Sequence, residues 1–132
     1  MSKSPIIPPA IQITLWAAQV LLSLSLIWSG SLKIMQSPAE LATMWPWTAQ
    51  VSETLLRSTG VIDLLGAAGI ILPGLLNIKP ILTPITAVGI VFLMASALIF
   101  HIARGETSGL GVNIFFGLAA VYVAWGRFRY RV

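Results

Sequence analysis

The fold is decided by the stretch IQITLWAAQVLLSLSLIWSGSL, which runs from Ile11 to Leu32 and contains no charged residue. A helix needs about 20 mostly apolar residues to cross a bilayer. This stretch meets that requirement, because most of its side chains are apolar and its polar side chains are uncharged. It therefore predicts a transmembrane helix over residues 11–32.

Three further apolar runs of similar length follow it. Residues 54–73 carry Arg57 near their start and Asp63 inside, residues 80–103 carry His101, and residues 107–126 carry no charge. We therefore expect an all-α, polytopic membrane four-helix bundle, with residues 1–132 as a single transmembrane domain. Four crossings would place both termini on the same side of the membrane.

The composition agrees with a membrane protein and excludes several kinds of site. Of the 132 residues, 57% are hydrophobic and 9% are charged, whereas soluble domains have roughly 25% charged residues. The chain has no cysteine and one histidine, so we expect no metal site and no covalently bound cofactor. The net charge of +4 comes from basic residues scattered near the ends of the apolar runs. That pattern indicates membrane anchoring, with no nucleic-acid partner.

The basic residues also predict an orientation. The side that would hold the termini and the second connection has five of them and the opposite side has three: Lys3, Lys79, Arg127, Arg129 and Arg131 against Lys33, Arg57 and Arg104. Basic residues concentrate on the cytoplasmic side. We therefore expect both termini to be cytoplasmic in a bacterial inner membrane, with the three arginines of the tail anchored on anionic lipid.

The first connection, about residues 33–56, is the one long loop that the pattern predicts. Its Ser37-Pro38-Ala39-Glu40 segment has the form of a capping box with proline at the first helical position. We expect a short interfacial helix over residues 38–44. It is followed by Trp45 and Trp47, whose indoles favour head-group depth. They would form either an interfacial belt or a lid over a site beneath.

Three of the polar residues inside the apolar runs lie at one level, judged by their spacing from the helix ends. Asp63, His101 and Asn113 each share a helical face with small residues, and Lys33 marks the end of the first run at the same level. Small residues lie where transmembrane helices meet, so these side chains should point into the bundle.

Two interpretations of this polar layer remain open. In the first it serves packing, with Asp63 paired to Arg57 or Lys33, and such a cation would hold the acid in its charged form. In the second it forms a pocket, because ionisable residues inside a membrane often mark functional sites. The candidate binding residues are Lys33, Arg57, Asp63, His101, Arg104, Asn113, Trp45 and Trp47.

Several segments together resemble the DoxX-like branch of the DoxX superfamily, from about Trp16 to Arg127. They are the run Gly30-Ser31-Leu32-Lys33, the stretch from Arg57 to Pro73, the stretch from Leu82 to Gly89, and His101. The family usually has glutamate where this chain has Asp63. The resemblance implies a four-helix bacterial inner-membrane protein. The family takes its name from a subunit of an archaeal thiosulfate:quinone oxidoreductase.

These observations lead to three hypotheses about function. The first is a quinone-facing or accessory subunit of a membrane oxidoreductase, in which Asp63 and His101 exchange protons with the ring and electrons come from a partner subunit or a diffusible quinone. The alternative is a non-enzymatic module that binds a lipid, an amphiphile or a partner helix, and homodimerisation stays open. The third is a small proton-coupled exporter, although the exporters with one buried acid carry it on the first helix.

Overall fold

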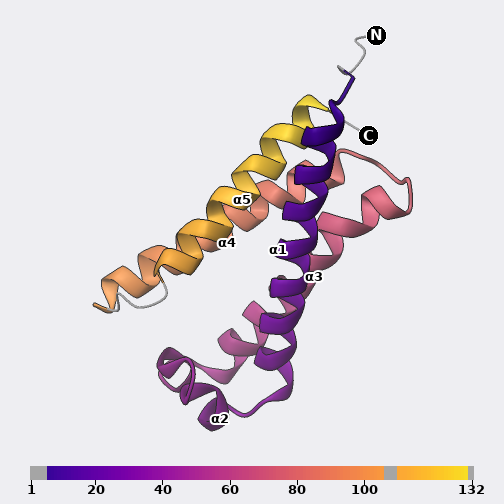
Figure 1. Cartoon of the computed structure of the whole chain (residues 1–132). Coiled ribbons are helices and arrows are strands. Elements are labelled where there is room, and N and C mark those ends of the chain that lie inside the picture. Colours follow the sequence, from indigo (N-terminus) through magenta and orange to yellow (C-terminus); the bar gives the residue numbers. More distant parts are fainter. Residues whose placement is uncertain (1–5, 106–109, 131–132) are drawn as a thin grey trace.

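The computed structural model describes residues 6–105 and 110–130, and this part of the chain is almost entirely helical (Figure 1). The elements in chain order are α1 (Pro9–Met35), α2 (Pro38–Ala42), the 3-10 helix η1 (Pro46–Ala49), α3 (Glu53–Leu75), α4 (Leu82–Ala103) and α5 (Leu110–Arg129). The predicted all-helical fold class is thereby confirmed. α1, α3, α4 and α5 are each long and apolar enough to cross a membrane.

The end of α3 differs from the sequence expectation. The second apolar run was expected to end at residue 73, but α3 continues to Leu75. Pro73 lies in the last turn, where it costs one bond to the Gly69 carbonyl and the following residues keep helical geometry. The helix ends where Asn77 adopts a left-handed conformation, with φ of 53°, and the Ile78 amide donates to the Pro73 carbonyl at 3.1 Å.

The capping box after α1 forms, but with a different second bond. The Ser37 hydroxyl accepts from the Glu40 amide at 3.2 Å and donates to the Glu40 carboxylate at 3.1 Å. In a standard capping box that carboxylate accepts from the backbone amide of the N-cap residue instead. The expected helix over residues 38–44 is shorter, because α2 ends at Ala42. η1, which the tryptophan–proline segment did not predict, follows at once.

The four long helices form two antiparallel pairs. α1 packs along α3 and α4 packs along α5, while smaller contacts of α3 with α4 and of α1 with α5 join the pairs. Figure 1 shows the pairs diverging toward the end of the bundle at which α2 lies. We call this end the loop end, and we call the opposite end, where α1 begins and α5 ends, the termini end.

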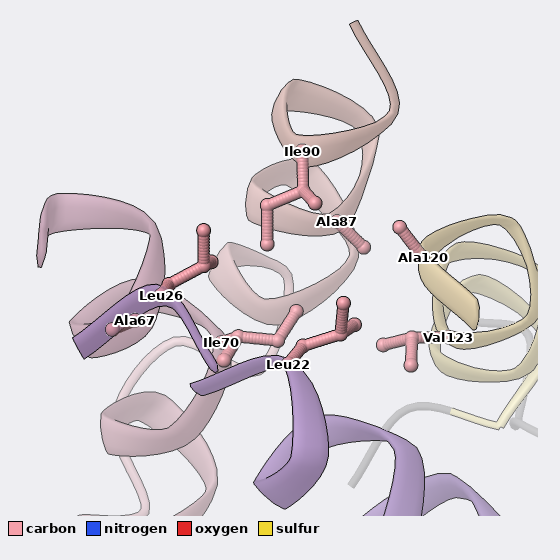
Figure 2. Close-up of a cluster of buried hydrophobic side chains, with 8 residues drawn as sticks. All are labelled: Leu22, Leu26, Ala67, Ile70, Ala87, Ile90, Ala120 and Val123. Atoms are coloured by element: carbon pink, nitrogen blue, oxygen red, sulfur yellow. The ribbon is translucent and has the colours of Figure 1, made fainter. Parts of the chain in front are cut away.

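The packed core lies where the two pairs cross. Figure 2 shows eight buried apolar side chains from all four helices pointing toward a common centre. They are Leu22, Leu26, Ala67, Ile70, Ala87, Ile90, Ala120 and Val123. Because the helix pairs separate beyond this cluster, its side chains do not fill the space between the pairs at the loop end.

Two glycines set the spacing of α1 and α3 near the loop end. A Cβ atom added to Gly30 would lie 2.8 Å from the Gly60 carbonyl oxygen, and one added to Gly60 would lie 3.0 Å from the Gly30 carbonyl oxygen. Glycine at both positions therefore allows the two backbones to touch. This crossing brings the next turn of α1, which carries Lys33, against Asp63 of α3.

Candidate ligand-binding cavity

A cavity of about 760 Å³ opens at the loop end between the two helix pairs. Its volume lies within the range of about 300–1,000 Å³ that is usual for small-molecule sites. All four long helices and the loop after α2 contribute to its wall. Most of the lining is apolar, and the polar or charged members are Ser25, Ser29, Lys33, Asp63, His101 and Asn113.

A buried ion pair lies in the wall of this cavity. The Nζ atom of Lys33 is 3.0 Å from Oδ2 of Asp63, and the Ser29 hydroxyl donates to the same oxygen at 3.0 Å. The Asp63 side chain is 3% exposed and that of Lys33 is 14% exposed. Burial of either charge alone would be costly, so each stabilises the other in this position.

Two indole rings cover the lysine. The Nζ atom of Lys33 lies 5.7 Å from the ring centroid of Trp45 and 5.6 Å from that of Trp47. A cation at this distance from an aromatic face is attracted by the quadrupole of the ring. The ammonium group therefore has one carboxylate and two rings as neighbours.

The same tryptophans connect the loop to both sides of the cavity. The Trp45 ring contacts Trp28 of α1, with centroids 5.7 Å apart, and the Trp47 ring contacts Phe100 and His101 of α4 at 5.9 and 6.5 Å. These contacts are edge-to-face, the favoured arrangement for aromatic pairs. The loop thus spans from α1 to α4 across the loop end of the cavity.

The structure brings together six of the eight candidate binding residues. Lys33, Asp63, His101, Asn113, Trp45 and Trp47 line the cavity.

The other two candidates, Arg57 and Arg104, lie elsewhere in the described part of the chain. The Nη1 group of Arg57 donates to the carbonyls of Lys33 and Gln36, and its Nη2 group donates to the Glu53 carboxylate at 2.9 Å. Arg57 therefore binds the carboxyl end of α1, where carbonyls lack helical partners. Arg104 lies over the Phe100 ring at 5.4 Å.

Sequence reasoning missed a second polar cluster, at the termini end. Arg127 was expected to lie on lipid head groups as part of a basic tail, but it is buried and only 5% exposed. Its Nε atom donates to the Gln19 side chain at 2.8 Å and its Nη1 atom donates to the Gln12 side chain at 2.6 Å. The available signal was the pair of glutamines seven residues apart, which places both on one face of an apolar helix.

Ser29 was also missed as a partner of Asp63. Serine is common at the contacts of transmembrane helices, so its type alone gave no specific signal. Its position one turn before Lys33 on α1 is the feature that could have identified it.

The lining combines a neutral polar end with an apolar body. The charges of Lys33 and Asp63 cancel, while the Asn113 amide and a ring N–H of His101 are hydrogen-bond donors by residue type. Leu93, Met94 and Phe116 form part of the apolar wall. This arrangement suits an amphiphile with an uncharged polar head.

Comparison with known proteins gave one match. The model of the DoxX-like family matches residues 17–123. No curated protein and no solved structure gave a significant match to the chain.

Proposed function

The chain belongs to the DoxX-like family and is a multi-pass membrane protein, and we propose that its cavity receives the ring of a membrane-soluble quinone. The protein would then act as a quinone-facing or accessory subunit of a membrane oxidoreductase system. The quinone supplies the redox chemistry, and the side chains of the cavity bind and orient its ring.

The observation that carries this proposal is the cancellation of charge in the cavity wall. Lys33 and Asp63 are within 3.0 Å of each other, so the pair offers no net charge to a ligand. A phosphate head group would have to compete with the Asp63 carboxylate for the lysine. A quinone ring is uncharged and needs hydrogen-bond donors for its carbonyl oxygens, which Asn113 and His101 provide by type.

The remaining wall suits the other parts of a quinone. Trp47 contacts His101 and Phe100, so an aromatic surface lies beside the polar end of the cavity. The apolar wall includes Val112, which is 57% exposed on the outside of the bundle. An isoprenoid tail could therefore leave the cavity toward the hydrocarbon region of the membrane.

The quinone proposal is tested by titrating the purified full-length chain in detergent with a short-tailed quinone. Binding is measured as quenching of tryptophan fluorescence. Trp28, Trp45 and Trp47 line the cavity, so we expect saturable quenching. Asn113→Leu should weaken apparent affinity roughly 3- to 10-fold, the value of one hydrogen bond. Ser96→Ala, an exposed residue of α4 outside the lining, is the control and should leave it unchanged.

Two results would count against quinone binding. Quenching that rises linearly with quinone concentration would indicate collision within the micelle instead of a site. Equal quinone affinities of the wild type and Asn113→Leu would show that the quinone does not bind in the cavity.

The proposal also assigns an orientation, with both termini in the cytoplasm and the cavity in the outer leaflet of a bacterial inner membrane. Lys79 and Arg129 are exposed at the termini end, whereas Lys33 and Arg57 at the loop end are each paired with a carboxylate. The chain has no cysteine, so a single introduced cysteine is the one thiol in the protein that a maleimide can label. In intact cells an impermeant maleimide should label Gln50→Cys and spare Lys79→Cys; the reverse labelling would invert the orientation.

A second candidate function is a non-enzymatic module for a lipid or other amphiphile. It is favoured by the exposure of part of the wall, since Leu24 and Trp28 are 61% and 55% exposed and an acyl chain could enter beside them. Organic extraction of the purified protein distinguishes the two. One equivalent of phospholipid without quinone would favour the module, and one equivalent of quinone would favour the redox subunit.

A further inference from the structure

A second cavity lies at the termini end of the bundle, opposite to the quinone cavity. It has a volume of about 30 Å³ and is lined by residues of all four long helices and the turn before α4: Trp16, Gln19, Gly74, Pro80, Thr83 and Arg127. A water-sized particle needs about 10–15 Å³. The cavity therefore has room for one or two such particles, or for one oxygen atom of a larger group.

One side chain in this cavity has an unused donor. Arg127 is 5% exposed, and its Nε and Nη1 atoms donate to Gln19 and Gln12. Its Cζ atom lies 5.6 Å from the centroid of the Trp16 ring. Its Nη2 atom is buried and has no hydrogen-bond partner in the described residues. A buried donor without a partner is rare in native proteins, so this group indicates a ligand that the chain itself does not supply.

The charge around Arg127 shows which kind of ligand fits. Within residues 6–105 and 110–130 the ion pairs are Lys33–Asp63 and Arg57–Glu53, both at the loop end. The two partners of Arg127 are neutral carboxamides, so its positive charge has no carboxylate partner in this part of the chain. A water molecule would satisfy the donor but leave the charge, whereas an anion would satisfy both.

The surroundings point to a phosphate. Lys79 is exposed and directly precedes Pro80 of the cavity wall. Basic pockets between transmembrane helices at a membrane surface are typical sites for anionic lipid head groups. We propose that this cavity binds an anionic phosphate, with one phosphate oxygen accepting from Nη2 of Arg127.

The site would also stabilise the junction of the helix pairs. Arg127 is carried by α5 and its partners Gln12 and Gln19 are carried by α1, while the Gln19 amide in turn donates to the Ile70 carbonyl of α3 at 2.8 Å. A phosphate bound to Arg127 would therefore stabilise the packing of α1, α3 and α5 against one another. Ligand binding to the native state alone raises the melting temperature.

The test measures Tm of the full-length chain in three detergent mixtures of equal ionic strength: with phosphatidylglycerol, with zwitterionic phosphatidylcholine, and with inorganic phosphate. We expect a saturable rise of roughly 4 °C or more with phosphatidylglycerol over phosphatidylcholine. The same rise with inorganic phosphate would identify free phosphate as a sufficient ligand. A rise with phosphatidylglycerol alone would identify the lipid head group, and both results support the phosphate site.

Three variants locate the effect. Arg127→Gln should abolish the rise, whereas Arg129→Gln removes an equal charge from the same end and should keep it. Thr83→Leu should also abolish it, since the larger side chain fills the cavity and leaves the bonds of Arg127 to α1 in place. This third variant carries the test if Arg127→Gln fails to fold.

The proposal is wrong if neither phosphatidylglycerol nor inorganic phosphate raises Tm above the value measured with phosphatidylcholine, whose phosphate charge is balanced by choline. It is equally wrong if the rise persists in Thr83→Leu and in a folded Arg127→Gln, because the phosphate would then bind elsewhere. Neither result would bear on the proposed quinone site, because that cavity lies at the loop end of the bundle.

Discussion

The ion pair between Lys33 and Asp63 leads to the most quantitative prediction, a double-mutant cycle. The variants are Asp63→Asn, Lys33→Met and the double variant, each compared with wild type. Each single variant leaves one buried group without its partner, while the double variant replaces both charges with neutral side chains of similar size. The cycle therefore isolates the interaction from the effects of each substitution alone.

The expected magnitudes follow from distance and burial. At 3.0 Å the attraction is about 5.5 kcal/mol for an effective dielectric constant near 20, before desolvation is subtracted. We expect Lys33→Met to cost about 3 kcal/mol, because the Asp63 carboxylate is almost fully buried. Asp63→Asn should cost about 2 kcal/mol, since Lys33 keeps the rings of Trp45 and Trp47. The double variant should also cost about 2 kcal/mol, which leaves a coupling energy of about 3 kcal/mol.

The assay is unfolding of the detergent-solubilised protein by sodium dodecyl sulfate, followed by far-ultraviolet circular dichroism. The pair Arg57–Glu53 is the control, because its side chains are 29% and 65% exposed and its coupling should be about 0.5 kcal/mol or less. A coupling energy for Lys33 and Asp63 no larger than this control would refute the reasoning, since it would mean that the pair is solvated or does not form.

Three further tests of the packing use the same unfolding assay. Gly30→Ala should destabilise the folded protein by about 1–3 kcal/mol, because the new methyl group would meet the backbone of α3. Gly89→Ala is the control and should be close to neutral, because its methyl group would meet no atom of another helix within 4 Å. Equal effects of the two substitutions would disprove the close crossing of α1 and α3. Ser52→Ala should cost about 1 kcal/mol by loss of the cap on the Leu55 amide at 3.1 Å, and no loss would show that the cap is dispensable. Leu22→Ala, in the core, should cost about 2 kcal/mol or more, in contrast to the exposed Leu24→Ala, and similar costs would argue against the core.

The fold class could be predicted from the sequence because lipid imposes a simple requirement. Long apolar runs must be helices that cross the membrane, since a backbone in hydrocarbon has to satisfy its own hydrogen bonds. The start of α2 was equally predictable, because Ser37 and Pro38 form a local signal. The family resemblance is likewise confirmed by the match over residues 17–123.

Helix ends and side-chain partners were harder to predict because they depend on contacts between distant segments. The second run was expected to end at residue 73, but a proline in the last turn removes only one hydrogen bond and α3 continues to Leu75. Arg57 was a candidate partner of Asp63, yet it binds the end of α1. Periodicity places a side chain on a face of its helix, but it does not tell which of several cations reaches an acid.

Arg127 shows the same limit most clearly. Its neighbours in sequence are Arg129 and Arg131, and a run of arginines at the end of a transmembrane helix usually lies on lipid head groups. The structure buries Arg127 because two glutamines of α1, more than 100 residues earlier, bind it. The divergence of the two helix pairs, which creates the larger cavity, was also outside the reach of the sequence pattern.

The central claim is that polar groups from separate helices meet around one cavity that holds a quinone. Photoaffinity labelling with an azidoquinone, followed by mass spectrometric mapping of the modified peptides, tests it most directly. A quinone in the cavity should give saturable labelling that is confined to the cavity wall and is reduced by competition with unmodified quinone. The labelled segments should be residues 22–33 of α1, residues 44–47 of the loop, residues 93–101 of α4 and residues 112–116 of α5. Labelling spread over the outer faces of α3 and α4, without competition, would contradict it.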